Sequence, residues 1–166
     1  YDENTWISLS WKEYGERVLR WRRAFHALGY RHGDRVAMLL TNCIDAVTFD
    51  QSAMANALVP VPLHAIDTPG SSAYILHDSD ARFLITTSLA RWNAIVKAAE
   101  DSRLSLDELD TVVIINEVIP EDTVHQVFDH KVQVMDIEKW LLKANAIAES
   151  ELPAGPTPDD LCELIY

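Results

Sequence analysis

The pattern of apolar and polar residues predicts a long helix near the start of the chain. Ser10 and Glu13 have the spacing of a capping box, in which each side chain can satisfy a free backbone N–H of the other. After them, apolar residues recur at steps of three and four, as one face of a helix requires: Trp11, Tyr14, Val18, Trp21, Phe25 and Leu28. Gly29 follows, and it can adopt the left-handed conformation that ends a helix.

Short apolar runs alternate with further helical patterns along the rest of the chain. The runs predict strands at 35–40, 59–63, 82–86, 111–115, 132–135 and 161–166. Helices are predicted at 43–58, at 71–78, after Ser88 and after Asp136, with Asn42, Ser88 and Asp136 as their N-caps where a cap is visible. Because Pro60 and Pro62 cannot donate backbone hydrogen bonds, their strand is expected to be short and to lie where those donors are not needed.

This order of elements predicts an α/β fold with a largely parallel sheet and helices on both faces, because crossover connections join parallel strands. Residues 1–150 are expected to form this α/β subdomain. Residues 116–130 are polar and aperiodic, so we expect a long exposed connection there. The Pro-rich segment 151–158 is interpreted as a linker, and residues 159–166 as the approach and final strand.

The net charge narrows the classes of partner. The 166 residues include 14 Lys and Arg against 26 Asp and Glu, which gives a net charge of −12. Such an acidic surface repels phosphate backbones and anionic lipids, which argues against nucleic-acid and membrane-surface binding. Cys43 and Cys162 are too few for a disulfide framework or a zinc site, and no signal peptide or membrane span is visible. We therefore expect a cytoplasmic protein, and the first residue, Tyr1, favours a piece of a longer chain.

No motif in the sequence identifies a reaction by itself. The sequence lacks the Gly-rich fingerprints of dinucleotide and P-loop sites and the nucleophile elbow of serine hydrolases. His64 and His77 flank the loop after the second predicted strand, and His64 follows a strand end, where α/β sheets bind ligands. Neither has a visible partner acid or nucleophile, so a structural role is favoured. A receiver domain would need an acidic cluster after the first strand, where Thr41 and Asn42 stand.

The remaining histidines are expected to have structural or surface roles. His26 is interpreted as a packed or edge residue of the first helix. The other three are interpreted as surface residues: His32, His125 and His130.

Five segments share their order and composition with one family of enzymes. They are 9–14 (LSWKEY), 28–36 (LGYRHGDRV), 57–63 (ALVPVPL), 74–79 (YILHDS) and 82–85 (RFLI). Together they resemble the N-terminal part of the adenylate-forming enzymes, and most of all the long-chain acyl-CoA synthetases. Asn42 stands where that family has Asn after the first strand, whereas Leu58 replaces its usual Gly. Residues 159–166 resemble the strand that leads into the family's Thr/Ser/Gly-rich phosphate loop, which would begin directly after Tyr166.

The resemblance implies a parent enzyme that joins a fatty carboxylate to AMP, releases pyrophosphate and transfers the acyl group to coenzyme A. ATP, Mg²⁺ and coenzyme A are the cofactors implied for that parent, and none is expected to bind this piece alone. No catalytic, cofactor-binding or metal-binding residue is carried over to this chain. We therefore expect an inactive scaffold, whose partners are the remainder of the parent enzyme together with the parent's fatty acid, ATP and coenzyme A.

Two other functions stay open at this point. The parent could activate an aryl or another small carboxylate within the same family. Alternatively, the chain could be a free-standing, flavodoxin-like binding or interaction module without chemistry. Apolar surface left uncovered on a piece of this kind also predicts a homodimer.

Overall fold

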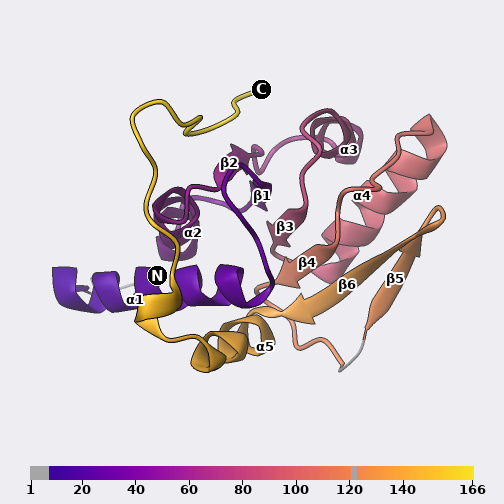
Figure 1. Cartoon of the computed structure of the whole chain (residues 1–166). Helices are drawn as coiled ribbons and strands as arrows, with labels where there is room; N and C mark the ends of the chain where they lie inside the picture. The colour runs from indigo at the N-terminus through magenta and orange to yellow at the C-terminus, as the bar shows by residue number, and fades with distance from the viewer. Residues whose placement is uncertain (1–7, 121–122) are drawn as a thin grey trace.

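A mixed sheet forms the centre of the molecule (Figure 1). The computed structural model describes residues 8–120 and 123–166, and within them six strands follow the order β2-β1-β3-β4-β6-β5. The bounds are β1 Arg35–Leu39, β2 Val59–Pro62, β3 Phe83–Thr86, β4 Thr111–Ile114, β5 Val124–Val127 and β6 His130–Asp136. β5 runs antiparallel to β6, whereas the other neighbouring pairs are parallel. The predicted fold class is confirmed.

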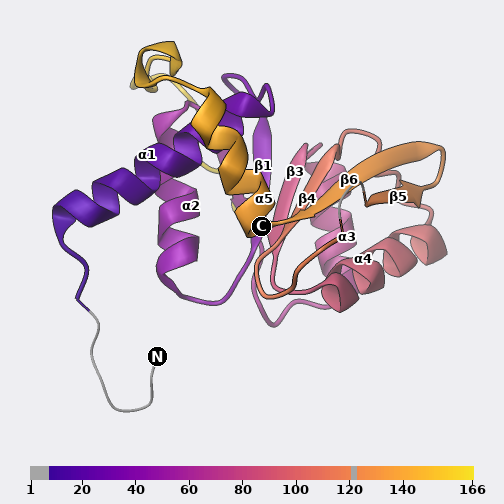
Figure 2. The same cartoon turned by 90° about the horizontal axis from the view of Figure 1, so that it is seen from below.

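Helices cover both faces of this sheet (Figures 1 and 2). On one face lie α1 Trp11–Ala27, α2 Ile44–Ala55 and α5 Ile137–Leu142; on the other lie α3 Pro69–Asp78 and α4 Leu89–Ser102. Two short 3-10 helices, Lys143–Ala146 and Glu149–Glu151, follow α5 within the described chain. Each face of the sheet therefore has its own apolar layer.

Aromatic rings fill the layer beneath α1, α2 and α5. The ring of Phe25 in α1 lies edge-on to Phe83 of β3 and Trp140 of α5, with centroids 5.2 and 4.9 Å away. Phe49 of α2 lies 5.6 Å from the same ring. All four side chains are fully buried. Because three helices and a central strand each supply a ring, this cluster joins segments from both ends of the chain.

The first helix forms as its sequence predicts. The Glu13 N–H donates to Ser10 Oγ at 3.2 Å, and the Ser10 N–H donates to the Glu13 carboxylate at 2.8 Å. The Ser10 hydroxyl and N–H lower the pKa of Glu13, because both stabilise its charged form. At the other end Gly29 adopts φ +81°, a conformation that strains residues with a Cβ.

Two helix starts differ from the prediction. α2 begins at Ile44 with Cys43 as its N-cap, so the predicted cap Asn42 is wrong. α3 begins before the predicted Ser71, because the Ser71 N–H donates to the Thr68 hydroxyl at 3.1 Å and Pro69 opens the first turn.

The predicted exposed connection at 116–130 is wrong in its second half. Val124–Val127 forms β5, which pairs with residues 130–133 of β6. β5 is an edge strand in which Val127 is buried while Val124 and Gln126 are exposed, so its composition is as polar as that of a loop.

Residues 161–166 form no strand in the described chain, contrary to the prediction. The Leu164 N–H donates to the Pro60 carbonyl at 3.0 Å. β2 explains why pairing stops there. The Val59 N–H donates to Asp34 beside β1, so the alternate residues Pro60 and Pro62 turn their backbone groups outward. Proline has no N–H, so this edge offers carbonyl acceptors without donors and cannot complete a ladder.

Side chains hold the rest of the C-terminal segment in place. His32 Nε2 lies 2.7 Å from the Asp160 carboxylate, and the Tyr166 hydroxyl donates to Asp78 at 2.8 Å. The Arg22 guanidinium donates to the Pro153 carbonyl at 3.2 Å. Ile165 nevertheless remains 75% exposed. The segment is a tethered surface strap and not the buried strand that the sequence suggested.

Candidate functional site

The topology marks one place where a ligand of an α/β sheet is expected. β2 lies on one side of β1 and β3 on the other, so the strand order reverses between β1 and β3. Open α/β sheets bind ligands at the carboxyl ends of their strands beside such a switch point. Here the switch point is bordered by Asn42 and Cys43 after β1, and by Thr87 and Ser88 after β3.

Most polar groups beside the switch point support local structure. Ser88 Oγ accepts the Arg91 N–H at 3.2 Å and so caps α4. The Thr87 carbonyl accepts the Asn116 N–H at 3.3 Å, and the Arg91 guanidinium donates to the Ala65 carbonyl. At the start of α2, by contrast, Cys43 provides no side-chain cap. The edge is therefore shaped by helix starts and loops, and its cation Arg91 already holds a loop.

Asp136 is the buried carboxylate at the carboxyl end of β6. It accepts the Lys139 N–H at 2.9 Å and the Ile119 N–H at 3.1 Å, and Lys139 Nζ lies 3.3 Å away. Burial alone would raise the pKa of Asp136, but these donors and the ammonium outweigh burial and lower it. The prediction that Asp136 caps α5 is confirmed. Because its oxygens already accept these hydrogen bonds, Asp136 is not positioned to act as a general base.

The structure does not bring His64 and His77 together as a site. His64 is exposed after β2, and its backbone N–H donates to the Asp67 carboxylate at 2.9 Å. His77 lies in the last turn of α3, with Nδ1 2.7 Å from the Ser105 carbonyl. The two histidines are therefore separated by the length of α3, at opposite edges of the sheet.

Two histidines interpreted as surface residues have partly buried contacts. His125 Nδ1 accepts the indole N–H of the fully buried Trp92 at 3.0 Å, and His130 Nε2 lies 2.9 Å from the Leu109 carbonyl. Both are half-buried. The partners come from segments far away in the sequence, so local pattern gave no sign of these contacts.

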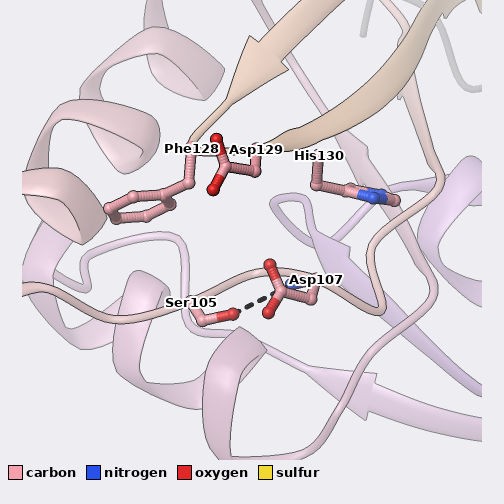
Figure 3. A pocket seen from close by; sticks show the side chains of 5 residues that line it. All are labelled: Ser105, Asp107, Phe128, Asp129 and His130. Carbon is pink, nitrogen blue, oxygen red and sulfur yellow. Dashed lines mark hydrogen bonds between the residues drawn. The ribbon is translucent and has the colours of Figure 1, made fainter.

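A shallow pocket opens at the amino ends of β4 and β6, away from the switch point. It is lined by the turn between β5 and β6 on one side and by the loop after α4 on the other (Figure 3): Phe128, Asp129, His130, Ser105 and Asp107. The Asp107 N–H donates to Ser105 Oγ at 3.3 Å. Two carboxylates and no Lys or Arg line it, so it suits neither ATP nor coenzyme A, which are anions. Sequence reasoning missed this pocket because two distant loops build it.

The most connected polar cluster lies at the amino edge of the sheet. The Arg82 guanidinium donates to Asp34 and to Asp110, each at 2.7 Å, and the Tyr30 hydroxyl donates to Asp110. Burial, followed by the charge of Asp110, raises the pKa of Tyr30, so its hydroxyl stays protonated. The arginine joins the entries to β1, β3 and β4. This cluster has a structural role, since its one guanidinium binds both carboxylates and the Tyr30 hydroxyl binds one of them.

The described residues contain no group of three or more His, Cys, Asp or Glu side chains that could hold a metal ion. In that part of the chain no helix is both long and apolar enough to cross a membrane. Cys43 and Cys162 are both free thiols.

Comparison with known proteins gives what the site alone does not. The profile of the family described as AMP-binding enzyme matches residues 1–166. The chain belongs to this family. A curated relative, fatty acyl-CoA synthetase A of Dictyostelium discoideum, is 26% identical over 162 residues, which are 95% of this chain and 22% of the relative. This chain spans only 16% to 22% of the length of the first curated relatives that it matches.

Solved structures of CoA ligases share the fold. A long-chain-fatty-acid-CoA ligase from Archaeoglobus fulgidus superposes with a TM-score of 0.70 at 17% identity, over 99% of this chain and 29% of that one. The anthranilate CoA ligase AuaEII, bound to anthranoyl-AMP, also gives 0.70 at 20% identity, over 92% of this chain and 26% of that one. The fold is therefore the N-terminal part of the adenylate-forming enzyme fold, as the sequence resemblance implied.

Proposed function

We propose that this chain is the N-terminal part of an AMP-forming acid–CoA ligase that acts on a fatty carboxylate. The observation that carries the proposal is the likeness to a fatty acyl-CoA synthetase over 95% of the chain, within a family match over residues 1–166. The chain spans 22% of that relative, so the activity is proposed for a full-length enzyme that contains it. The proposal does not depend on a terminal strand, which the structure lacks at residues 161–166.

The proposed reaction has two displacement steps. A carboxylate oxygen of the fatty acid attacks the α-phosphorus of ATP, the bond to pyrophosphate breaks, and an acyl-adenylate forms. The thiol of coenzyme A then loses its proton and attacks the acyl carbon, and AMP leaves with the electrons of the C–O bond. Mg²⁺, when bound with ATP, would neutralise charge on the phosphates. No step is assigned to a residue of this chain.

We propose that this chain alone is a scaffold without activity. Fatty carboxylate, ATP and coenzyme A are anions, and a chain with a net charge of −12 repels them unless cationic groups from elsewhere intervene. Exchange of labelled pyrophosphate into ATP, in the presence of fatty acid, tests this directly. We expect exchange by the full-length enzyme and none by residues 1–166 above a heat-denatured control. Exchange by the isolated chain would overturn the scaffold role.

An aryl or another small carboxylate is the second candidate substrate, because the anthranilate CoA ligase shares the fold over 92% of this chain. The ratio of kcat/KM for a long-chain fatty acid to that for anthranilate or benzoate separates the two, measured on the full-length enzyme. We expect the ratio to exceed about 10, the factor that one or two buried methylenes supply. A ratio below one would replace fatty acid with the smaller carboxylate.

The organisation proposed for the chain follows the same family. We propose residues 1–150 as the α/β subdomain, 151–158 as a linker and 159–166 as the approach to a phosphate loop in the full-length enzyme. A cytoplasmic location is proposed with it, since both free cysteines suit a reducing compartment.

A further inference from the structure

Four large side chains gather where the first turns of α1 and α2 meet. The rings of Trp11 and Tyr14 lie edge-on with centroids 6.3 Å apart, and the Tyr14 hydroxyl donates to the Val47 carbonyl at 3.2 Å. Ile44 precedes Val47 by one helical turn, on the same face of α2. Trp11, Val47 and Ile44 are 89%, 53% and 45% exposed. Trp11, Tyr14, Ile44 and Val47 are called the α1–α2 patch below.

The α1–α2 patch lies beside the carboxyl end of β1 and so borders the switch point. α2 starts directly after the loop that follows β1, and the Tyr14–Val47 contact brings the first turn of α1 to the same place. The first turns of α1 extend past α2 and away from the sheet in Figures 1 and 2. Trp11 stands on this projecting end, where the sheet and the other helices of the described chain do not cover it.

We propose that the α1–α2 patch is the contact face for the part of the full-length enzyme that lies outside this chain, with Trp11 as its anchor. This inference rests on the proposed function, which supplies that enzyme. The chain spans only 16% to 22% of the curated relatives, so an enzyme of their size carries several times more chain than the structure holds. A clustered apolar patch that contains an exposed Trp is typical of a contact face, in which aromatic anchors carry much of the binding energy.

Charge disfavours a second copy as the occupant. The net charge of −12 makes two copies repel each other over their whole surfaces. The remainder of the enzyme has no such constraint on its charge.

Hydroxyl-radical footprinting with mass spectrometry tests the proposal residue by residue. The isolated chain is compared with the full-length enzyme, both without substrates. Tyr74 is the matched control, since it is an aromatic residue 51% exposed on α3, on the opposite face of the sheet. We expect the labelling rate of Trp11 to fall at least fivefold in the full-length enzyme and that of Tyr74 to change less than twofold. A fall at Trp11 no larger than that at Tyr74 overturns the proposal.

Two further measurements separate the possible failures. Protection of Trp11 in the isolated chain that grows with protein concentration would identify a second copy as the occupant and overturn the proposal. Footprinting needs no turnover. A full-length enzyme that adenylates fatty acids but leaves Trp11 reactive would therefore overturn the proposed contact face and leave the proposed function unaffected. Protection of Trp11 in an enzyme without ligase activity defeats only the proposed function.

A substitution gives an independent check of the α1–α2 patch. Because Trp11 is 89% exposed here, Trp11→Ala should move the melting temperature of the isolated chain by less than about 2 °C. In the full-length enzyme the same substitution should lower it by at least twice the shift measured in the isolated chain, and Tyr74→Ala should not. Equal shifts for Trp11→Ala in the two proteins would contradict a buried anchor.

Discussion

Arg82 shows how a single side chain holds the amino edge of the sheet together. Its guanidinium spans Asp34 and Asp110 at 2.7 Å each and lies 5.3 Å from the centre of the Tyr30 ring. Arg82→Gln should lower the free energy of unfolding by about 1–3 kcal/mol, because it leaves two half-buried carboxylates without their cation. Urea denaturation followed by circular dichroism measures the change.

The matched control for Arg82 is an ion pair that water screens. Lys97 and Asp101 are 3.0 Å apart on α4, with side chains 75% and 65% exposed. Exposed pairs of this kind contribute about 0.3–0.5 kcal/mol, so Lys97→Gln should be several times milder than Arg82→Gln. Equal losses for the two variants would show that the amino-edge cluster is no stronger than a surface pair.

Asp136 links stability to pH. The pKa of the Asp136 carboxyl is lower in the fold than in the unfolded chain, where the pKa of Asp is about 3.9. The fold therefore stabilises the ionised carboxylate. Its contribution is therefore complete above about pH 5 and is lost as the pH falls through the lowered folded value. We expect the urea midpoint of the wild type to fall between about pH 5 and pH 3 more steeply than that of Asp136→Asn. Parallel curves for both proteins would rule out this role.

At the scale of elements, β2 shows how two prolines end a sheet. Pro60 and Pro62 occupy the outward positions of this edge strand, which leaves carbonyl acceptors without N–H donors. In residues 1–158, which lack the segment that lies against this edge, the double variant Pro60→Val and Pro62→Val should restore two donors and expose a complete edge, which templates pairing between copies. Sedimentation velocity should then show stronger concentration-dependent association than that of the same residues with both prolines.

A double substitution elsewhere separates the edge effect from a general effect of losing proline. Pro153 and Pro158 lie in the C-terminal segment outside the sheet, so replacing both with valine adds N–H groups but no strand edge. This control should remain monomeric at the same concentrations. Association of both double variants, or of neither, would contradict the role assigned to the β2 prolines.

The elements that the sequence predicts well are those whose local pattern agrees with their final surroundings. α1 has a capping box, one apolar stripe and a terminal Gly29, and its packing uses all three. β5 does not meet this condition, because an edge strand with a solvent-exposed face has the polar composition of a loop. Residues 161–166 fail it in the opposite way, since an apolar run found no edge able to pair with it. To predict this outcome, one would need to know whether the backbone groups of Pro60 point toward β1 or away from it. Only the register between β1 and β2 decides that.

At the scale of the whole molecule, the candidate site depends on contacts that have no local signature. The switch point arises from the strand order. The shallow pocket brings Ser105 and Asp107 close to Phe128, although these residues are too far apart in the sequence for a local motif to connect them. His64 and His77, near each other in sequence, lie at opposite ends of α3. Motif order along the chain carried the family resemblance, whereas the geometry of the site had to come from the fold.

The two apolar layers predict where the chain can be shortened. Removing residues 159–166 deletes the half-buried Leu164, the Tyr166–Asp78 bond and the His32–Asp160 pair, which are contacts at the surface of the fold. A partly buried Leu contributes about 1–3 kcal/mol, and solvent screens the two exposed polar contacts. Residues 1–158 should therefore stay folded, with the near-ultraviolet circular dichroism of the full chain and a modestly lower melting temperature.

Removing residues 137–166 should have a different outcome because it takes Trp140 out of the aromatic layer. That ring is fully buried between Trp21, Phe25 and Phe83, with centroids 5.0, 4.9 and 5.3 Å away. Loss of a buried Trp costs about 3–5 kcal/mol, a large part of the 5–15 kcal/mol by which a domain is stable. We expect residues 1–136 to lose the near-ultraviolet signal and to bind a hydrophobic dye. A cooperative thermal transition in residues 1–136, matching that of residues 1–158, would show that α5 is dispensable.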